Sequence, residues 1–310
     1  EVINLPKLPN RKISKLFSEE MLKEIEIIKS FINKFKNSDI YDYLSVSLSS
    51  TIRSIIESEN GNKILETFYK KIRNMNKIML EYNEALVSNP KIEIQNSDAR
   101  KLSILSNSID LVITSPPYVN ALDYYRIHMY NMFWLGMNYK SFKLNEIGGH
   151  SHFVQNRFRL LSEYLGDMLR SLIEMNRVLK KGKMCIIVIG NSTINYELIE
   201  SYKFFINMSK YIGFKHKKTI FRNIDKTSKS FNIGKIDNEY IVILQKENDT
   251  PFKTEDENSI FKIVKKEMQR FKSQIKKSPG SASNGKNVTE DRLLQNVLKI
   301  EEAIKNIKKI

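Results

Sequence analysis

Two consecutive prolines at the end of a short apolar run constrain the fold of this chain more than any other feature. The run, Ile109–Ile113, is interrupted only by Asp110. It is too short for a helix and rich in β-branched residues, which predicts a buried parallel strand. Pro116 and Pro117 then fix φ and remove two backbone donors, so neither a sheet ladder nor a helix can continue through them. The chain must form a rigid loop at the carboxyl end of a strand, where open α/β sheets bind ligands.

The loop holds groups that a ligand can use. Ser115 supplies a hydroxyl and Tyr118 an aromatic face. After the loop in the sequence, the apolar residues Tyr125, Met129 and Phe133 are spaced as in an amphipathic helix. A strand, a proline loop and a helix are therefore expected in succession.

This stretch resembles motif IV of the DNA amino-methyltransferases, which move a methyl group from S-adenosylmethionine to an exocyclic base nitrogen. The tetrapeptide Ser115–Tyr118 carries the resemblance, together with the strand before it. The segments Asn120–Tyr124 and Trp134–Gly136 after it also match one branch of that family.

The resemblance implies roles for the four loop residues. The Ser115 hydroxyl and the Pro116 carbonyl would accept hydrogen bonds from the target amine, and Pro117 would help to keep these acceptors in place. Tyr118 would stack on the base after it has flipped out of the duplex. No covalent intermediate is required.

The resemblance also implies S-adenosylmethionine as cofactor and places further residues around it. Asp98 lies where the family has an acid that contacts the cofactor adenine, and Ala99 and Thr114 are assigned to the same pocket. An Asx turn is the alternative for Asp98. Asn120, Tyr124 and Arg126 are candidates for the base or DNA channel; each could equally orient the start of the next helix. We expect no metal site, because four scattered histidines and one cysteine give no ligand spacing.

The chain departs from the family in one large respect. The glycine-rich cofactor loop is absent, and no G-x-G occurs among the 310 residues. An acidic residue ending a second strand, which would bind the ribose, is missing too. The missing half is therefore expected upstream of Glu1 or in a partner subunit.

The charge balance points to a polyanionic partner. The chain has 51 basic and 35 acidic residues, a formal charge of +16. Double-stranded DNA is the expected partner. Lys70, Lys71, Arg73 and Lys77 form a basic cluster that either contacts DNA or is a solvated helix face.

Nothing in the sequence suggests a membrane, because no apolar run reaches the length of a span. The single cysteine, Cys185, excludes an internal disulfide and fits a reducing cytoplasm. Its place in the apolar run Met184–Ile189 indicates a buried core residue.

We predict an α/β fold with a Rossmann-like methyltransferase sheet, incomplete and preceded by a helical segment. Three parts are expected: helical residues 1–90, a possible target-recognition insertion; a catalytic domain at 91–247; and a basic helical tail at 248–310. The predicted strands after 109–113 are 184–189, 217–222 and 239–245, with another at 91–95; the catalytic-domain helices are 161–179 and 196–212. Because no helix separates the last two strands, they should pair antiparallel.

The expected function is site-specific DNA methylation, in a restriction-modification setting. A serine at the first position of the tetrapeptide is typical of family members acting on cytosine N4, so Ser115 favours N4 of cytosine over N6 of adenine. The alternatives are an RNA amino-methyltransferase and a catalytically incomplete DNA-binding subunit.

Overall fold

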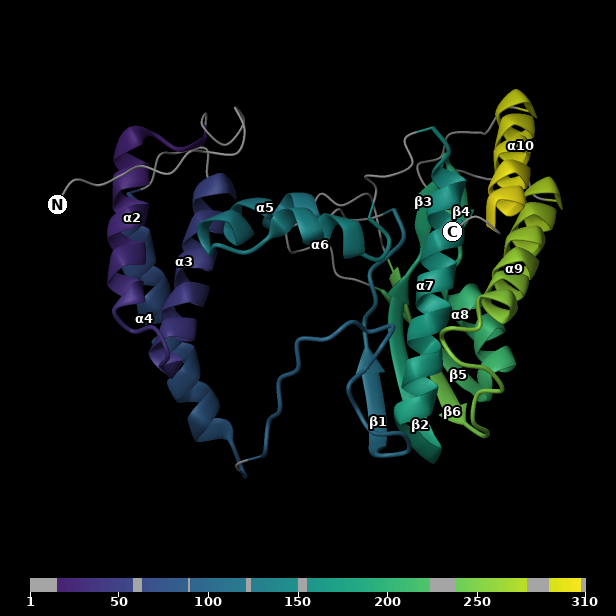
Figure 1. Cartoon of the computed structure of the whole chain (residues 1–310), viewed down its shortest axis with the longest axis horizontal. Coiled ribbons are helices and arrows are strands. Elements are labelled where there is room, and N and C mark those ends of the chain that lie inside the picture. Colours follow the sequence, from purple (N-terminus) through teal and green to yellow (C-terminus); the bar gives the residue numbers. More distant parts are fainter. Residues whose placement is uncertain are drawn as a thin grey trace. The chain divides into compact units, whose positions relative to one another are not determined.

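The computed structural model describes residues 16–57, 63–88, 90–120, 124–149, 155–223, 238–277 and 290–307. The chain divides into two compact units (Figure 1). One comprises residues 1–94 and 125–144, and the other comprises residues 95–124 and 145–310.

The first unit is helical. It contains α2 (Glu19–Asn33), α3 (Asp39–Glu57), α4 (Ile64–Ala85), most of α5 (Tyr124–Trp134) and α6 (Tyr139–Asn145). Ser18 caps α2 by accepting a hydrogen bond from the Met21 amide at 3.3 Å. The apolar residues spaced along α2 and α3 meet in one core, which also takes in Trp134 of α5. The Asn131 side-chain amide donates to Ser49 at 2.8 Å and so ties α5 to α3.

The second unit is built on a mixed sheet of four strands in the order β1-β2-β6-β5. β1 (Ile109–Thr114) pairs parallel with β2 (Leu179–Gly190). β6 (Asn238–Lys246) pairs antiparallel with β2 and also with β5 (Phe214–Asn223). The predicted α/β fold is confirmed, and so is the antiparallel pairing of the last two strands.

Helices cover one face of this sheet. α7 (Arg157–Val178) and α8 (Ser201–Ser209) contribute to the same buried core as β2 and β6. α9 (Glu257–Lys277) and α10 (Glu290–Asn306) form a further layer against α7 (Figure 1). Cys185 lies in this core, with its sulfur 3.9 Å from that of Met175. Burial raises the pKa of the Cys185 thiol to about 12, so the prediction of a buried core residue is confirmed.

The predicted strand at 91–95 is wrong. Residues 90–98 adopt neither helix nor strand, and Ile92 and Ile94 are 70% and 91% exposed. The alternation of apolar and polar residues is present, but a strand needs a neighbour to complete its hydrogen bonds. Among the described residues, none pairs with this segment as a strand.

The predicted helix at 196–212 begins too early. Asn195 and Tyr196 both have positive φ, at 50° and 72°, which is the backbone of a tight hairpin turn. They join β3 (Ser192–Ile194) to β4 (Glu197–Ile199), and α8 starts only at Ser201. A short 3-10 helix, η2 (Lys210–Ile212), follows α8.

Residues 137–160, where the sequence shows no clear periodicity and predicts a long loop, contain helical structure as well. α6 lies inside it, and α7 begins at Arg157. Asn156 caps α7 by accepting a hydrogen bond from the Phe158 amide at 3.1 Å. No helix in the described part of the chain combines the length and the apolar character that crossing a membrane requires.

The two faces of the sheet should respond differently to the same truncation. Ile187 in β2 is 0% exposed, whereas Ile113 in β1 is 66% exposed. In the isolated chain, Ile187→Ala should lower the free energy of unfolding by about 2–5 kcal/mol, because it leaves a cavity. Ile113→Ala should change it by about 0.5 kcal/mol or less. Urea denaturation measures both, and equal losses would contradict the one-sided core.

Candidate active site

The proline loop leaves the sheet at the carboxyl end of β1. Thr114, the last residue of the strand, is half-buried and pairs in register with Ile187 of β2. Pro116 is buried and Ser115 is exposed, so the loop is anchored by one side chain and presents the other to solvent. The sequence predicted the loop at the carboxyl end of this strand, but not which of its side chains is buried.

Neighbouring elements hold the loop through its carbonyl oxygens. The Tyr164 hydroxyl of α7 donates to the Pro117 carbonyl at 2.8 Å, and the Ser192 hydroxyl of β3 donates to the Val119 carbonyl. Gly148 has a φ of +80°, and a Cβ there would lie 3.2 Å from the Tyr164 ring. Neither hydrogen bond uses the Pro116 carbonyl, the second predicted acceptor.

Tyr118 is held by a carboxylate that lies 121 residues later in the chain. Its hydroxyl donates to the Glu239 carboxylate at 2.6 Å, and Arg222 of β5 forms an ion pair with the same carboxylate. The strand register explains this meeting: Glu239 lies opposite Gly190 at the end of β2 and opposite Arg222 in β5.

These contacts keep Tyr118 protonated. Burial raises the pKa of its hydroxyl well above the ordinary value, and the hydrogen bond and negative charge of Glu239 raise it further. Hydrogen bonding by the Ser115 side chain and the Gly190 backbone has the opposite, smaller effect.

The side-chain oxygens of Asn120 and Asn191 are buried at this end of the sheet. Asn120, with a φ of +57°, donates from its side-chain nitrogen to the Thr193 carbonyl at 2.7 Å. Asn191, just after β2, approaches the Tyr240 hydroxyl at 3.5 Å with its side-chain nitrogen. Among the described residues, neither side-chain oxygen has a hydrogen-bond partner. Both are therefore buried acceptors left unsatisfied by the described residues.

Two of the predicted cofactor residues, Asp98 and Ala99, lie in the segment before β1. Asp98 forms the Asx turn, accepting from the Arg100 amide at 2.8 Å, and its carboxylate lies 2.7 Å from the Arg100 guanidinium. That contact is the main reason why the pKa of Asp98 is lowered. Ala99 is exposed. No G-x-G turn occurs in the sequence.

The other predicted substrate residues fall in different units. The Tyr124 amide donates to Glu146 at 2.6 Å in the second unit, and the hydroxyl of Tyr124 has a raised pKa, chiefly from burial. Arg126 is exposed and belongs to the helical unit. Within the second unit, the structure brings together Ser115–Tyr118 and Asn120.

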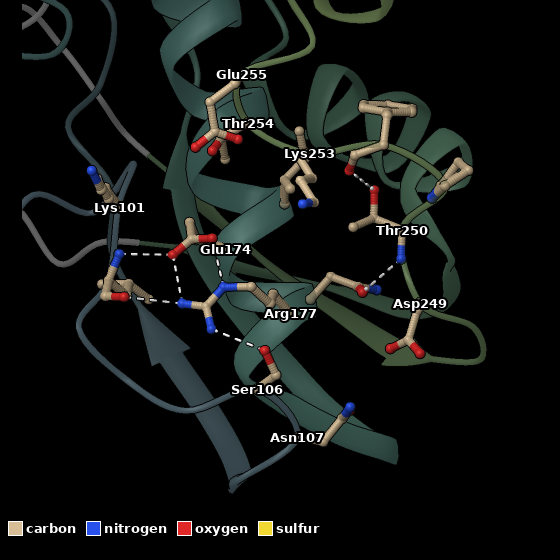
Figure 2. Close-up of a pocket in the computed structure, with 15 residues that line it drawn as sticks. Lys101, Ser106, Asn107, Glu174, Arg177, Asp249, Thr250, Lys253, Thr254 and Glu255 are labelled. Atoms are coloured by element: carbon tan, nitrogen blue, oxygen red, sulfur yellow. Dashed lines mark hydrogen bonds and ion pairs between the residues drawn. The ribbon is translucent and has the colours of Figure 1, made fainter.

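A cavity of about 710 Å³ lies at the opposite, amino-terminal end of β1 (Figure 2). Its wall contains Arg177 and Glu174, which are paired at 2.7 Å. The Arg177 guanidinium donates to the Leu102 and Ile104 carbonyls, and Glu174 accepts from the Leu102 amide. These groups satisfy the backbone that leads into β1, so their role is structural.

Comparison with known proteins identifies the family. Residues 109–308 match the sequence profile of the family described as DNA methylase, of the N6/N4 type. The chain belongs to this family. The match begins with β1 and includes the proline loop and the whole sheet. A comparison with curated proteins found no match.

Solved structures similar to this DNA methylase include two of TTHA0409 from Thermus thermophilus, provisionally designated a DNA modification methylase. One is 18% identical, covers 53% of this chain and 57% of its own, and has a TM-score of 0.31. The other, a complex with S-adenosyl-L-methionine, is 19% identical, covers 52% and 58%, and has a TM-score of 0.32. The chain thus spans little more than half the length of these proteins.

Sequence reasoning missed three residues that hold the loop. Glu239 is the second residue of β6, and only the register of β6 against β2 places it beside Tyr118. Ser192 lies two residues after the end of β2, and only its place after a predicted apolar strand could have marked it. Tyr164 carried no signal beyond its place on the apolar side of a helix.

The contact between Tyr118 and Glu239 predicts a shift in titration. In Glu239→Gln the negative charge is gone, so the pKa of Tyr118 should fall. It should stay above about 10, the ordinary value for tyrosine, because burial is the largest cause and persists. Ultraviolet absorbance titration measures this, after subtraction of the same titration in a Tyr118→Phe background. An unchanged pKa would show that Glu239 does not act on Tyr118.

Proposed function

We propose that this chain carries the catalytic loop of a site-specific DNA methyltransferase that modifies an exocyclic amine. S-adenosyl-L-methionine, which accompanies the Thermus protein, is the proposed methyl donor. The anchored proline loop at the carboxyl end of β1 carries the proposal, because it presents an exposed Ser115 beside a fixed Tyr118. Membership of the DNA methylase family supports it.

The loop can prepare the amine for attack. An exocyclic amine is a poor nucleophile because its lone pair is delocalised into the base ring. Acceptors at Ser115 Oγ and the Pro116 carbonyl would bind the two amine protons and favour the pyramidal nitrogen. The loop is held through Pro117 and Val119, so these acceptors need little reorganisation during the reaction.

Tyr118 and Glu239 would orient the Ser115 hydroxyl. The Tyr118 hydroxyl directs its proton at Glu239 and can therefore accept from Ser115. With its own proton directed at Tyr118, the Ser115 oxygen turns its lone pairs toward an incoming amine. The target base would reach this point by flipping out of the duplex and stacking on Tyr118.

Cytosine N4 is the proposed target atom, in preference to adenine N6. The basis is the serine at position 115, by resemblance to family members that act on cytosine. Hydrogen bonding alone does not discriminate, since a hydroxyl can accept from the amine of either base. A restriction-modification setting is proposed on the same resemblance.

The cofactor site would be completed by a further segment carrying a glycine-rich turn. Asp98, Ala99 and Thr114 are proposed as this chain's share of the pocket. The missing turn is also the feature that favours the second candidate function, a DNA-binding subunit without activity of its own. Helical residues 1–90 and residues 137–160 are proposed for target recognition, and 248–310 as a basic tail.

Loss of the serine acceptor should slow methyl transfer. With the complete enzyme assembled, Ser115→Ala should lower the rate about a hundredfold, as loss of one preorganised hydrogen bond does elsewhere. Ser273→Ala, at an exposed serine on α9, is the matched control and should have no effect. Nucleoside mass spectrometry of the methylated DNA gives both rate and product. N6-methyladenine as the sole product would overturn the assignment of the base.

DNA binding should depend steeply on salt, because contacts to phosphates release counterions. We expect affinity for duplex DNA to fall at least about tenfold between about 50 and 200 mM salt. The double variant Lys70→Ser/Arg73→Ser, on α4, should reduce the slope if that cluster touches phosphates. Lys262→Ser/Lys265→Ser on α9 removes the same charge and is its control. Salt-independent affinity would contradict the electrostatic basis.

A further inference from the structure

The hairpin formed by β3 and β4 lies directly beside the proline loop. Two hydrogen bonds join them: the Ser192 hydroxyl donates to the Val119 carbonyl, and the Asn120 side-chain amide donates to the Thr193 carbonyl at 2.7 Å. Tyr196, at the tip of the hairpin, follows Thr193 by three residues. At roughly 3.3 Å per residue, the tip is therefore about 10 Å or less from the contact with the loop.

Tyr196 has a backbone conformation that its residue type disfavours. Asn195 and Tyr196 are the two central residues of the hairpin turn, with φ of 50° and 72°. A turn with positive φ at both positions favours Asn followed by Gly. Asn195 meets the first preference, whereas a bulky residue with positive φ is strained. Glycine at position 196 would form the same turn without the strain.

The contacts that hold this turn do not explain the tyrosine. The Asn296 side-chain amide of α10 donates to the Asn195 carbonyl at 3.2 Å and to the Glu197 carboxylate at 2.8 Å. Both bonds would persist with glycine at position 196, because neither uses that side chain. The Tyr196 ring lies 4.2 Å from the Arg292 guanidinium, and the residue is 39% exposed. A cation–π contact at an exposed site contributes less free energy than strain of this kind costs.

An exposed aromatic ring beside an arginine is a surface on which a nucleobase can stack. Such stacking tolerates any sequence, because every base has a π-face. When a target base flips out of a duplex, the neighbouring base loses a stacking partner, and this loss is part of the free-energy cost of flipping. An aromatic ring that takes the vacated position lowers that cost.

We propose that Tyr196 contacts the DNA substrate by stacking on the base next to the flipped target, while the target lies at the proline loop. The inference rests on the proposed function, because it takes a flipped base as given. It adds to Tyr118 a second aromatic contact, on a separate element. The strained turn is retained because it fixes the ring at the tip of the hairpin, close to the loop.

Photo-cross-linking to DNA tests the contact directly. The probe is a pool of duplexes of random sequence, each with one mismatched cytosine, which flips at low cost, and with 5-iodouracil as the adjacent base. The complete enzyme is irradiated on this pool, and the cross-linked peptides are sequenced. Tyr196 should be the cross-linked residue of the hairpin. Cross-links confined to residues outside 192–199, or no cross-link at all, overturn the proposal.

Replacement by glycine separates DNA contact from folding. Tyr196→Gly should weaken binding of the complete enzyme to this pool about tenfold, through loss of one stacked base, whereas Tyr196→Phe should change it about twofold or less. Leu198→Ala, at a 44% exposed position of the same hairpin, is the control and should leave the affinity unchanged. The urea midpoint of Tyr196→Gly should not fall, because the strain is removed with the ring. A lower midpoint shows that the ring serves the fold; that result, or unchanged affinity, overturns the proposal.

Methyl transfer by the unmodified enzyme is measured separately on duplex DNA. A cross-link at Tyr196 without any methylation leaves the DNA contact standing and refutes the proposed function. Methylation without a cross-link in the hairpin refutes the contact alone.

Discussion

The candidate site depends on the proline loop, in which two consecutive residues lack a backbone N–H donor. Pro116 and Pro117 cannot hydrogen-bond through nitrogen, so the loop is fixed through oxygen. Tyr164 and Ser192 donate to the carbonyls of Pro117 and Val119. One donor comes from α7 and the other from β3, the segment after β2, so the loop is held only where the sheet and its helical layer have formed.

The same dependence explains the position of Tyr118. Its partner, Glu239, comes from the antiparallel strand β6, 121 residues later in the chain, and Arg222 of β5 pairs with that carboxylate. Insertion of β6 between β2 and β5 therefore does more than close the sheet. It places a charged pair at the hydroxyl of Tyr118.

The parts of the fold that a local pattern determines could be predicted from the sequence, and the parts that a partner determines could not. The proline loop, the strand before it and the final antiparallel pair each follow from residues within a short window. The segment at 91–95 has the alternation of a strand but no neighbouring strand among the described residues, so the pattern alone misled. Likewise, Asn195 and Tyr196 take positive φ to form a hairpin, although an apolar helical pattern follows them. The contact of Glu239 with Tyr118 could not be predicted from the sequence, because only the strand register brings the two residues together.

The two faces of the sheet contribute unequally to the stability of this unit. Ile187 and Ile189 are buried on one face, whereas Leu111 and Ile113 are exposed on the other. Full burial of each such side chain contributes about 1.5–3 kcal/mol, so the face that packs against α7 and α8 supplies most of the apolar stabilisation. The proline loop begins where β1 ends, and the packing of that one face therefore also fixes where Ser115 lies.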